Sequence, residues 1–305
     1  MPDSNTIFEI TSRTIQRRFL MRPSKEVNEI ILGVIGRGLE LYPSVELYIY
    51  VFMSNHFELL ASAPDFGTIS AFIGHLKSNI ARELGAIHDW REKFWGRRFS
   101  SIPVLDEPAL LGRVRYILEH GCKENLVVRP GDWPGLQCVR ALTEGEPIKG
   151  YWYDRTAAYL ADREGKQVSS DEFVQEYEVR LKPLPCWADL TEEARQAKFS
   201  DLVEAIEIET AERVRTDGVR PLGRKRVLRQ NPHDHPERPN QSPAPPCHAA
   251  RRAVRRWYRR AYREFLEAYQ RASNSFRSGG LSVEFPAHCF RPPLPYYSGQ
   301  VFAPG

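Results

Sequence analysis

The segment from Val45 to Ala61 constrains the fold more than any other part of the chain. Two runs of β-branched and aromatic residues, Val45–Met53 and Phe57–Ala61, are separated only by residues 54–56. Residues of these types are enriched in strands, and small polar residues between them favour a turn or a bulge. The segment therefore predicts two consecutive strands joined by a very short connection.

The second of these strands carries a histidine and a glutamate two positions apart. Residues i and i+2 of a strand project from the same face, so His56 and Glu58 point together while Phe57 points into the core. An imidazole beside a carboxylate can hold a hard or borderline divalent cation. The competing interpretation is an ordinary polar pair on a partly exposed strand face.

Length and composition bound the class of protein. The chain has 305 residues, of which 42% are hydrophobic, as in folded proteins with one large or two ordinary domains. Its longest apolar run, Val45–Met53, is far shorter than a membrane span, and its first residues lead into no apolar signal segment. Five scattered cysteines without a CxxC spacing favour free thiols in a reducing cytoplasm. We therefore expect a cytoplasmic protein with no membrane partner.

Periodicity in the first 150 residues indicates an α+β domain. Further strands are expected at Ile7–Ser12 and Ser101–Leu105, and helices at Pro23–Leu39, Thr68–Leu84 and Pro108–His120. The order strand, helix, strand, strand, helix, strand, helix is that of a ferredoxin-like sandwich, an antiparallel sheet with helices, plus one added helix.

The composition changes after Gly150. Helices are expected at Tyr151–Ala161, Ser170–Leu181, Thr191–Val214 and Ala249–Ala272. The Pro-rich run at residues 231–246 indicates a linker, and the zinc-ligand types in and after it, His233, His235, Cys247 and His248, have no common zinc-finger spacing. We therefore divide the chain into a domain at 1–150, a helical accessory region at 151–230, a linker at 231–246, and a basic helix with a Pro- and aromatic-rich tail at 247–305.

The helix that ends near residue 120 carries Tyr116 and His120, four positions apart. This spacing places both side chains on one helical face, about one turn from each other. A metal held by His56, Glu58 and His120 could polarise a phosphodiester that the Tyr116 phenol attacks. The competing interpretation for Tyr116 is a ring packed in the core.

Several segments carry a family resemblance. The strand Asn55–Leu60 resembles the His-hydrophobe-His strand of single-tyrosine HUH transposases. Phe94–Phe99, and Val114–Val127 followed by Asp132-Trp133-Pro134, resemble motifs of the REP-associated tyrosine transposases (RAYT) in particular, and Glu9–Arg13 is similar to that family's first strand. The matching segments span roughly residues 1–140, in order and with the expected spacing.

The resemblance implies a fold, an activity and a set of site residues. In that family the tyrosine that matches Tyr116 is the nucleophile, and a polar residue at the position of His120 completes the metal site. The implied activity is metal-dependent nicking and transesterification of single-stranded DNA next to a hairpin. It would leave a 5′-phosphotyrosyl link and a free 3′-hydroxyl, and relatives recognise short palindromic repeats.

Glu58 departs from the family pattern, which has a second histidine at this position. A carboxylate still ligates Mg²⁺ or Mn²⁺ through oxygen, so His56, Glu58 and His120 are expected to hold one of these two ions. The departure leaves an alternative open, in which the chain is a domesticated protein that binds hairpin DNA without cutting it.

The final helix has an almost purely cationic face. Its arginines come in pairs every four residues and suit a phosphate backbone, although the glutamates at 204–212 are possible internal partners. Arg97 and Arg98, next to Trp95, are further candidates for contact with a phosphate or a base. The basic residues of the helix expected to bind nucleic acid are Arg251, Arg252, Arg255, Arg256, Arg259, Arg260 and Arg263.

The expected partner is single-stranded or hairpin DNA, bound by a monomer or a homodimer that is associated with the bacterial nucleoid when on DNA. A third interpretation is a structural or interaction protein, in which the C-terminal helices mediate assembly and the arginines pair with acidic helices. A weak dependence of DNA binding on salt would favour that third interpretation, because true phosphate contacts weaken steeply as salt rises.

Overall fold

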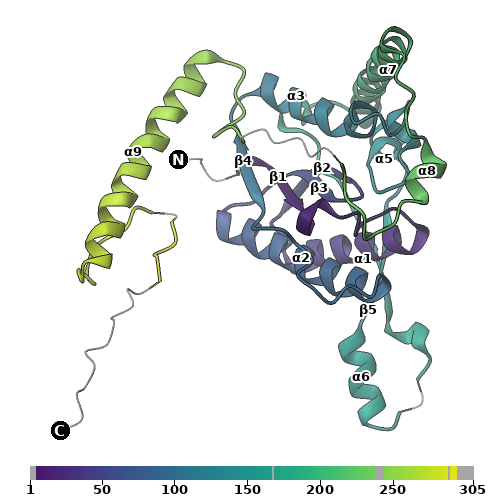
Figure 1. Ribbon diagram of the computed structural model, residues 1–305, viewed down its shortest axis with the longest axis horizontal. Coiled ribbons are helices and arrows are strands. Elements are labelled where there is room, and N and C mark those ends of the chain that lie inside the picture. The colour runs from purple at the N-terminus through teal and green to yellow at the C-terminus, as the bar shows by residue number, and fades with distance from the viewer. Residues whose placement is uncertain (1–4, 167, 238–243, 288, 294–305) are drawn as a thin grey trace. The chain divides into compact units, whose positions relative to one another are not determined.

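The computed structural model describes residues 5–166, 168–237, 244–287 and 289–293 (Figure 1). The chain forms two compact units, one of residues 3–248 and one that begins at Ala249. The finer division predicted at residues 150, 230 and 246 stays a prediction. No helix among the described residues is long and apolar enough to span a membrane.

The first unit is built on a four-stranded antiparallel sheet. Its strands are β1 (Ile7–Arg13), β2 (Glu46–Phe52), β3 (His56–Ser62) and β4 (Ser100–Val104), in the spatial order β2-β3-β1-β4. The hairpin predicted around residue 55 therefore exists, and β3 lies inside the sheet. Its register sets Glu58 opposite Thr11 of β1 on one side and opposite Val51 of β2 on the other.

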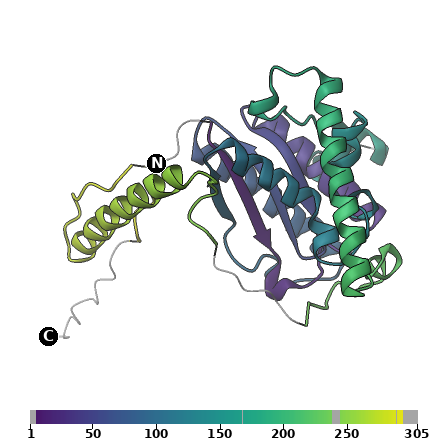
Figure 2. The ribbon, with the colours of Figure 1, turned by 90° about the horizontal axis from the view of Figure 1, so that it is seen from above.

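Two long helices, α1 (Lys25–Leu41) and α2 (Phe66–Ile87), cover one face of this sheet (Figures 1 and 2). Each begins at a side chain of a type that favours the N-cap position: Ser24 accepts a hydrogen bond from Val27 N, and Asp65 accepts one from Thr68 N. The apolar residues that repeat at helical spacing on the second helix are fully buried: Ile69, Phe72, Ile73, Leu76, Ile80 and Leu84. The predicted α+β class is thus confirmed.

The opposite face of the sheet carries α3 (Glu107–Leu118), which Asp106 caps by accepting from Ala109 N (Figure 2). The helix predicted to reach His120 ends two residues earlier. A new short helix, α4 (His120–Lys123), begins with that histidine. The 3-10 turns η1 (Ile15–Arg17) and η2 (Pro130–Asp132) and the short helix α5 (Val139–Thr143) complete this part of the unit.

After residue 150 the helix predicted at Ser170–Leu181 was wrong, and the one predicted at Tyr151–Ala161 is helical only from Arg155 onward. Residues Lys149–Tyr153 form strand β5, which pairs antiparallel with β6 (Val174–Glu178), and only the hairpin's far end contains α6 (Arg155–Arg163) and the turn η3 (Ser170–Phe173). The physical reason is a close backbone contact with α1. A Cβ on Gly33 would lie 1.9 Å from Tyr151 O, and one on Gly150 would lie 2.4 Å from Leu32 O, so paired glycines let β5 lie directly on the helix.

The remaining elements are η4 (Pro185–Trp187), the long helix α7 (Glu192–Asp217) and α8 (Arg224–Leu228). Helix α7 agrees with the predicted Thr191–Val214 helix and packs against α5. The second unit contains α9 (Arg252–Arg277), as the periodicity at 249–272 predicted.

Both edge strands of the sheet are covered by other parts of the chain. At β4, His248 N donates to Pro103 O and Leu105 N donates to His248 O, so residue 248 extends the sheet by one parallel bridge. At β2, Phe52 N donates to Leu136 O and Lys182 N donates to Leu47 O. The chain just after the segment predicted as a linker therefore docks on the sheet.

Candidate metal centre and nucleophile

The three predicted ligands converge on one point beneath α3 and α4. His56 Nε2 lies 3.0 Å from His120 Nε2, and Glu58 Oε2 lies 3.2 Å from His120 Nδ1. One ligand atom from each residue falls within 4.8 Å of the others, and no other group of three histidine, cysteine or acidic residues meets this condition in the part of the chain that the structure describes. The strand alternation and the helical spacing thus bring together residues 56, 58 and 120.

With both imidazoles neutral, the protons available in this cluster do not satisfy its nitrogen and oxygen atoms. Glu58 and His120 are 4% and 3% exposed, and within the described residues neither Glu58 Oε2 nor His120 Nδ1 has a hydrogen bond of good geometry. A neutral imidazole carries one N–H, so His120 can serve the carboxylate or His56 but not both. One pair of acceptors is then left face to face about 3 Å apart. A cation at this point removes the conflict, and the two imidazoles and one carboxylate are a donor set that fits a divalent metal.

Asn55 orients the first ligand. Its side-chain oxygen lies 2.7 Å from His56 Nδ1, so the proton of a neutral ring belongs on Nδ1 and the Nε2 lone pair faces the cluster. Burial, then the charges of His120, Arg13 and Arg17, hold the pKa of His56 well below its usual value. His56 is therefore neutral near pH 7, the form in which an imidazole ligates a metal.

Tyr116 lies directly beside this cluster. Its ring meets the His120 ring edge to face, with centroids 5.4 Å apart, which confirms that residues 116 and 120 share one side of the helix despite the break after Leu118. The Arg113 guanidinium and the Lys123 ammonium lie 3.8 and 4.2 Å from its ring centroid. Burial and the nearby Glu58 charge raise the pKa of Tyr116 to about 12, whereas Arg113 lowers it.

Arg113 is itself held by a buried carboxylate that the sequence did not reveal. Glu9, 4% exposed on β1, accepts hydrogen bonds from Arg113 and from the imidazole of His248. Burial alone would raise the pKa of Glu9, but the hydrogen bonds and charges of His248 and Arg113 outweigh it, so the pKa lies below its usual value. His248, the last residue of the first unit, is thus linked through Glu9 to Arg113, the side chain that stacks on Tyr116.

A cavity of about 380 Å³ opens over the cluster. His56, Tyr116 and His120 line it together with Arg13 and Arg17, two residues that sequence reasoning did not assign to the site. The only sequence signal was their position, since Arg13 is the last residue of the Glu9–Arg13 motif and Arg17 follows it by four residues. The cavity gives a ligand access to both the metal centre and the phenol.

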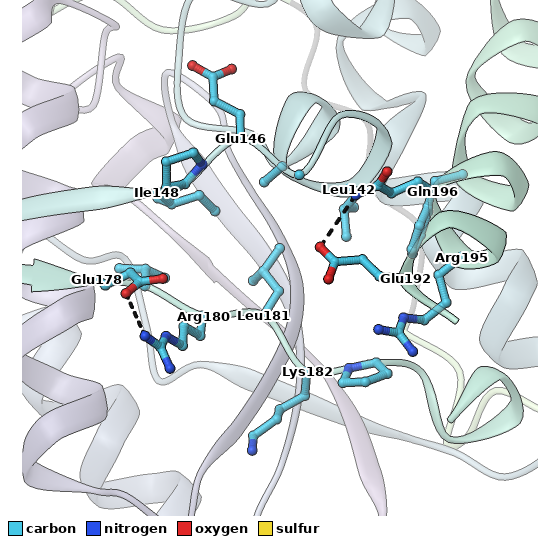
Figure 3. A pocket seen from close by; sticks show the side chains of 16 residues that line it. Leu142, Glu146, Ile148, Glu178, Arg180, Leu181, Lys182, Glu192, Arg195 and Gln196 are labelled. Carbon is cyan, nitrogen blue, oxygen red and sulfur yellow. Dashed lines mark hydrogen bonds and ion pairs between the residues drawn. The ribbon is translucent and has the colours of Figure 1, made fainter. Parts of the chain in front are cut away.

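A second cavity, of about 370 Å³, lies away from these residues (Figure 3). Acidic and basic side chains from the β6 end and α7 line it. Glu178 binds Arg180, and Gln196 donates to Glu192. Neither Tyr116 nor any of the three predicted metal ligands lines this cavity, so we assign it no part in the chemistry.

The predicted nucleic-acid contacts occupy two further regions. Lys77 Nζ donates to Arg97 O, and Trp95 Nε1 donates to Lys77 O, which fixes the segment that carries Arg97 and Arg98 on α2. The arginines of the last helix belong to the second unit. All lie on or at the start of α9, and all except Arg255 are exposed. Their role in DNA binding stays a prediction.

Comparison with known proteins gives similarity in structure only. No family model and no curated protein matches the chain. One similar solved structure is a REP-associated tyrosine transposase bound to a REP hairpin, with 16% identity and a TM-score of 0.39 over 46% of this chain and 81% of that one. Another is a putative transposase from Deinococcus radiodurans R1, with 18% identity and a TM-score of 0.29 over 37% of this chain and 88% of that one. The family that the sequence motifs resemble is thus also found among the structural neighbours of this chain.

Proposed function

We propose that this protein is a metal-dependent transesterase that nicks single-stranded DNA beside hairpin or palindromic repeat elements through a phosphotyrosine intermediate. The observation that carries the proposal is the buried His56–Glu58–His120 cluster, with its unsatisfied ligand atoms, in contact with Tyr116. Attack on a phosphodiester requires a nucleophile, here the phenol, and a group that polarises the phosphate, here a cation held beside it. The motif resemblance supports DNA as the substrate.

In this mechanism the Tyr116 oxygen attacks phosphorus. The new O–P bond forms as the P–O3′ bond breaks, the phenol proton passes to solvent, and the 3′ oxygen takes up a proton. A Mg²⁺ or Mn²⁺ ion held by His56, Glu58 and His120 would polarise the scissile phosphate and stabilise charge on the leaving oxygen. A later attack by a DNA hydroxyl on the phosphotyrosine restores the enzyme without ATP.

Arg113 prepares the nucleophile in two ways. Its guanidinium stacks on the Tyr116 ring and restricts it, and its positive charge lowers the pKa of the phenol. Glu58 acts in the opposite direction while its charge is uncompensated. Any cation that pairs with the carboxylate weakens this repulsion, so occupation of the centre and activation of the phenol are coupled electrostatically.

The DNA would be held by basic residues outside the centre. Arg97 and Arg98 would contact the strand near the site, and the α9 arginines would bind the hairpin stem or flanking duplex through phosphates. In this proposal residues 1–150 carry the chemistry, 151–230 support them, and residues from 247 onward bind DNA in the cytoplasm. A monomer or a homodimer would serve, and sedimentation on and off DNA distinguishes the two.

The second candidate is a hairpin-binding protein without cleavage activity. The observation that favours it is the phenol itself, half-buried beneath two cations and with a pKa of about 12. Such a tyrosine reacts only if the bound metal and DNA change its surroundings.

The deciding experiment is a cleavage assay on single-stranded hairpin DNA from the flanks of this gene, with Mg²⁺, Mn²⁺ or EDTA. The proposal expects a denaturant-resistant adduct with 3′-labelled DNA and a released 5′-labelled fragment that ends in a 3′-hydroxyl. Tyr116→Phe should abolish the adduct, whereas Tyr159→Phe, at an exposed position of α6, should leave it unchanged. Tight hairpin binding with no adduct in either metal would select the second candidate.

A further inference from the structure

The cavity over the metal centre has a basic side that the chemistry above does not use. Arg13 and Arg17 line it on the side of His56, and the sheet register sets Arg13 directly opposite His56 across β1 and β3. Both side chains are half-buried. A DNA strand that enters the cavity to reach Tyr116 therefore passes Arg13 and Arg17.

A third arginine adds to this charge. Gly96 N donates to Arg13 O, and Trp95 pairs with Thr14 in an antiparallel bridge, so Arg97 directly follows a segment that is hydrogen-bonded to the Arg13–Arg17 stretch. In agreement with this placement, partial burial and then the positive charges of Arg13 and Arg97 lower the pKa of the Arg17 guanidinium. Among the described residues, no carboxylate comes within ion-pair distance of Arg13 or Arg97. Glu124 is the one carboxylate that lines the described cavity. Like charges gathered at a cavity wall repel one another, and an anion between them relieves the repulsion.

The backbone that presents Arg17 is strained. Gln16 and Arg17 have φ values of 51° and 60°, a left-handed conformation that is unfavourable for two successive residues other than glycine. Hydrogen bonds hold it: Arg17 N donates to Thr14 O, Thr14 Oγ1 donates to Arg18 O, and Asn55 Nδ2 donates to Arg17 O. Asn55 is the residue that also orients His56. The conformation of Arg17 is thus fixed by the same side chain that fixes a metal ligand.

We propose that Arg13, Arg17 and Arg97 form a second phosphate-binding position, which takes the DNA phosphate next to the one that Tyr116 attacks. The inference rests on the proposed function for the identity of the ligand, a nucleic-acid phosphate. Guanidinium groups suit this ligand because they donate paired hydrogen bonds to phosphate oxygens. One cavity of about 380 Å³ is lined by Tyr116 and by Arg13 and Arg17, so the two phosphates belong to neighbouring nucleotides. Binding at the second position would hold the scissile phosphate in register with Tyr116.

The test measures binding of single-stranded hairpin DNA in EDTA, so that neither metal nor cleavage is required. A series of oligonucleotides carries one neutral methylphosphonate at each position near the hairpin. The affinity of the wild-type protein should fall about tenfold when the methylphosphonate replaces the phosphate that occupies the second position. The reason is that a hydrogen bond to a charged group contributes about 1.5 kcal/mol or more. The double variant Arg13→Gln, Arg17→Gln should bind unmodified DNA at least about tenfold more weakly and should not respond to that position.

The salt dependence supplies a second readout. Each phosphate contacted in a single strand contributes about 0.7 to the slope of log K against log salt, so loss of this one phosphate contact should lower the slope by about 0.7. The control variant Arg163→Gln, on the exposed surface of α6, removes one positive charge elsewhere. It should change neither the affinity for unmodified DNA nor the position at which the methylphosphonate weakens binding. Arg17→Gly guards against misfolding, because glycine accepts the left-handed conformation without strain. It should weaken binding with no fall in Tm.

Two negative results have different meanings. If the double variant binds DNA as tightly as wild type, or keeps the wild-type sensitivity to the methylphosphonate, the second phosphate position is wrong while the proposed function stands. If the wild-type protein binds none of the hairpins, both the proposed function and the second phosphate position are wrong.

Discussion

Replacing Glu58 by glutamine should change stability in opposite directions with and without metal. In the protein without metal, Glu58 Oε2 is buried, faces His120 Nδ1 at 3.2 Å and has no well-formed hydrogen bond. An unsatisfied buried acceptor costs about 1–3 kcal/mol, and the glutamine amide can donate where the carboxylate cannot. Glu58→Gln should therefore raise the Tm of the metal-free protein by about 3–9 °C, at roughly 3 °C per kcal/mol for a unit of this size.

The same substitution removes the one anionic ligand of the cluster. Mn²⁺ at about one hundred times its Kd should stabilise the wild-type protein by about 2.7 kcal/mol, or about 8 °C. Glu58→Gln should lose most of this increase. Glu124→Gln is a matched control, because it removes a carboxylate from the wall of the same cavity without touching the cluster.

The assay is thermal unfolding followed by circular dichroism at pH 8, with EDTA or with added Mn²⁺. Calorimetric titration of Mn²⁺ into each variant measures the affinity directly. The combination of a lower Tm in EDTA and an intact Mn²⁺ response in Glu58→Gln would refute the reasoning. It would mean that the carboxylate stabilises the fold as an ion pair and takes no part in metal binding.

Three further outcomes follow from features described above. Because the pKa of His56 is held well below its usual value, the unfolded chain binds a proton there that the folded protein rejects. Stability should therefore fall as the pH drops below about 6.5, and His56→Asn should flatten this fall in thermal melts between pH 8 and pH 5. Gly33→Ala should destabilise the protein by about 3 kcal/mol or more in urea titrations, because its Cβ would overlap Tyr151 O, whereas Gly112→Ala, in open space on α3, should be neutral or stabilising. Gln16→Gly should not lower the Tm, since glycine relieves its left-handed strain; a loss of several degrees would argue against that strain.

Local patterns in the sequence were sufficient for the core of the sheet and its two covering helices. The stripe from Ile69 to Leu84 repeats at helical spacing, and Ser24 stands where a helix cap is needed, so both signals agree with the packing that the structure shows. The same reasoning failed at Tyr151–Tyr153. These aromatic residues were interpreted as part of a helix, and the contact that makes them a strand lies on α1, more than a hundred residues earlier in the chain.

In the candidate site, too, some contacts could be predicted from the sequence and others could not. The pairs His56–Glu58 and Tyr116–His120 each lie close together in sequence, so the period of a strand or a helix predicted which side chains point together. The partners of Glu9 could not be found in this way, because His248 is 239 residues away and reaches it only through the folded sheet. The position of Arg17 depends on a left-handed backbone that no helical or strand periodicity encodes.

The covered edges of the sheet have a consequence for how this protein can be shortened. Strands β2 and β4 have their outward N–H and C=O groups partly occupied by residues 136, 182 and 248. A fragment that stops at residue 230 or 246 would leave β4 as a bare edge, free to pair with the same strand of another molecule. Such a fragment should aggregate, whereas one that ends just after His248 keeps its edge closed. The sheet thus depends for its solubility on a residue that lies at the far end of the folded unit.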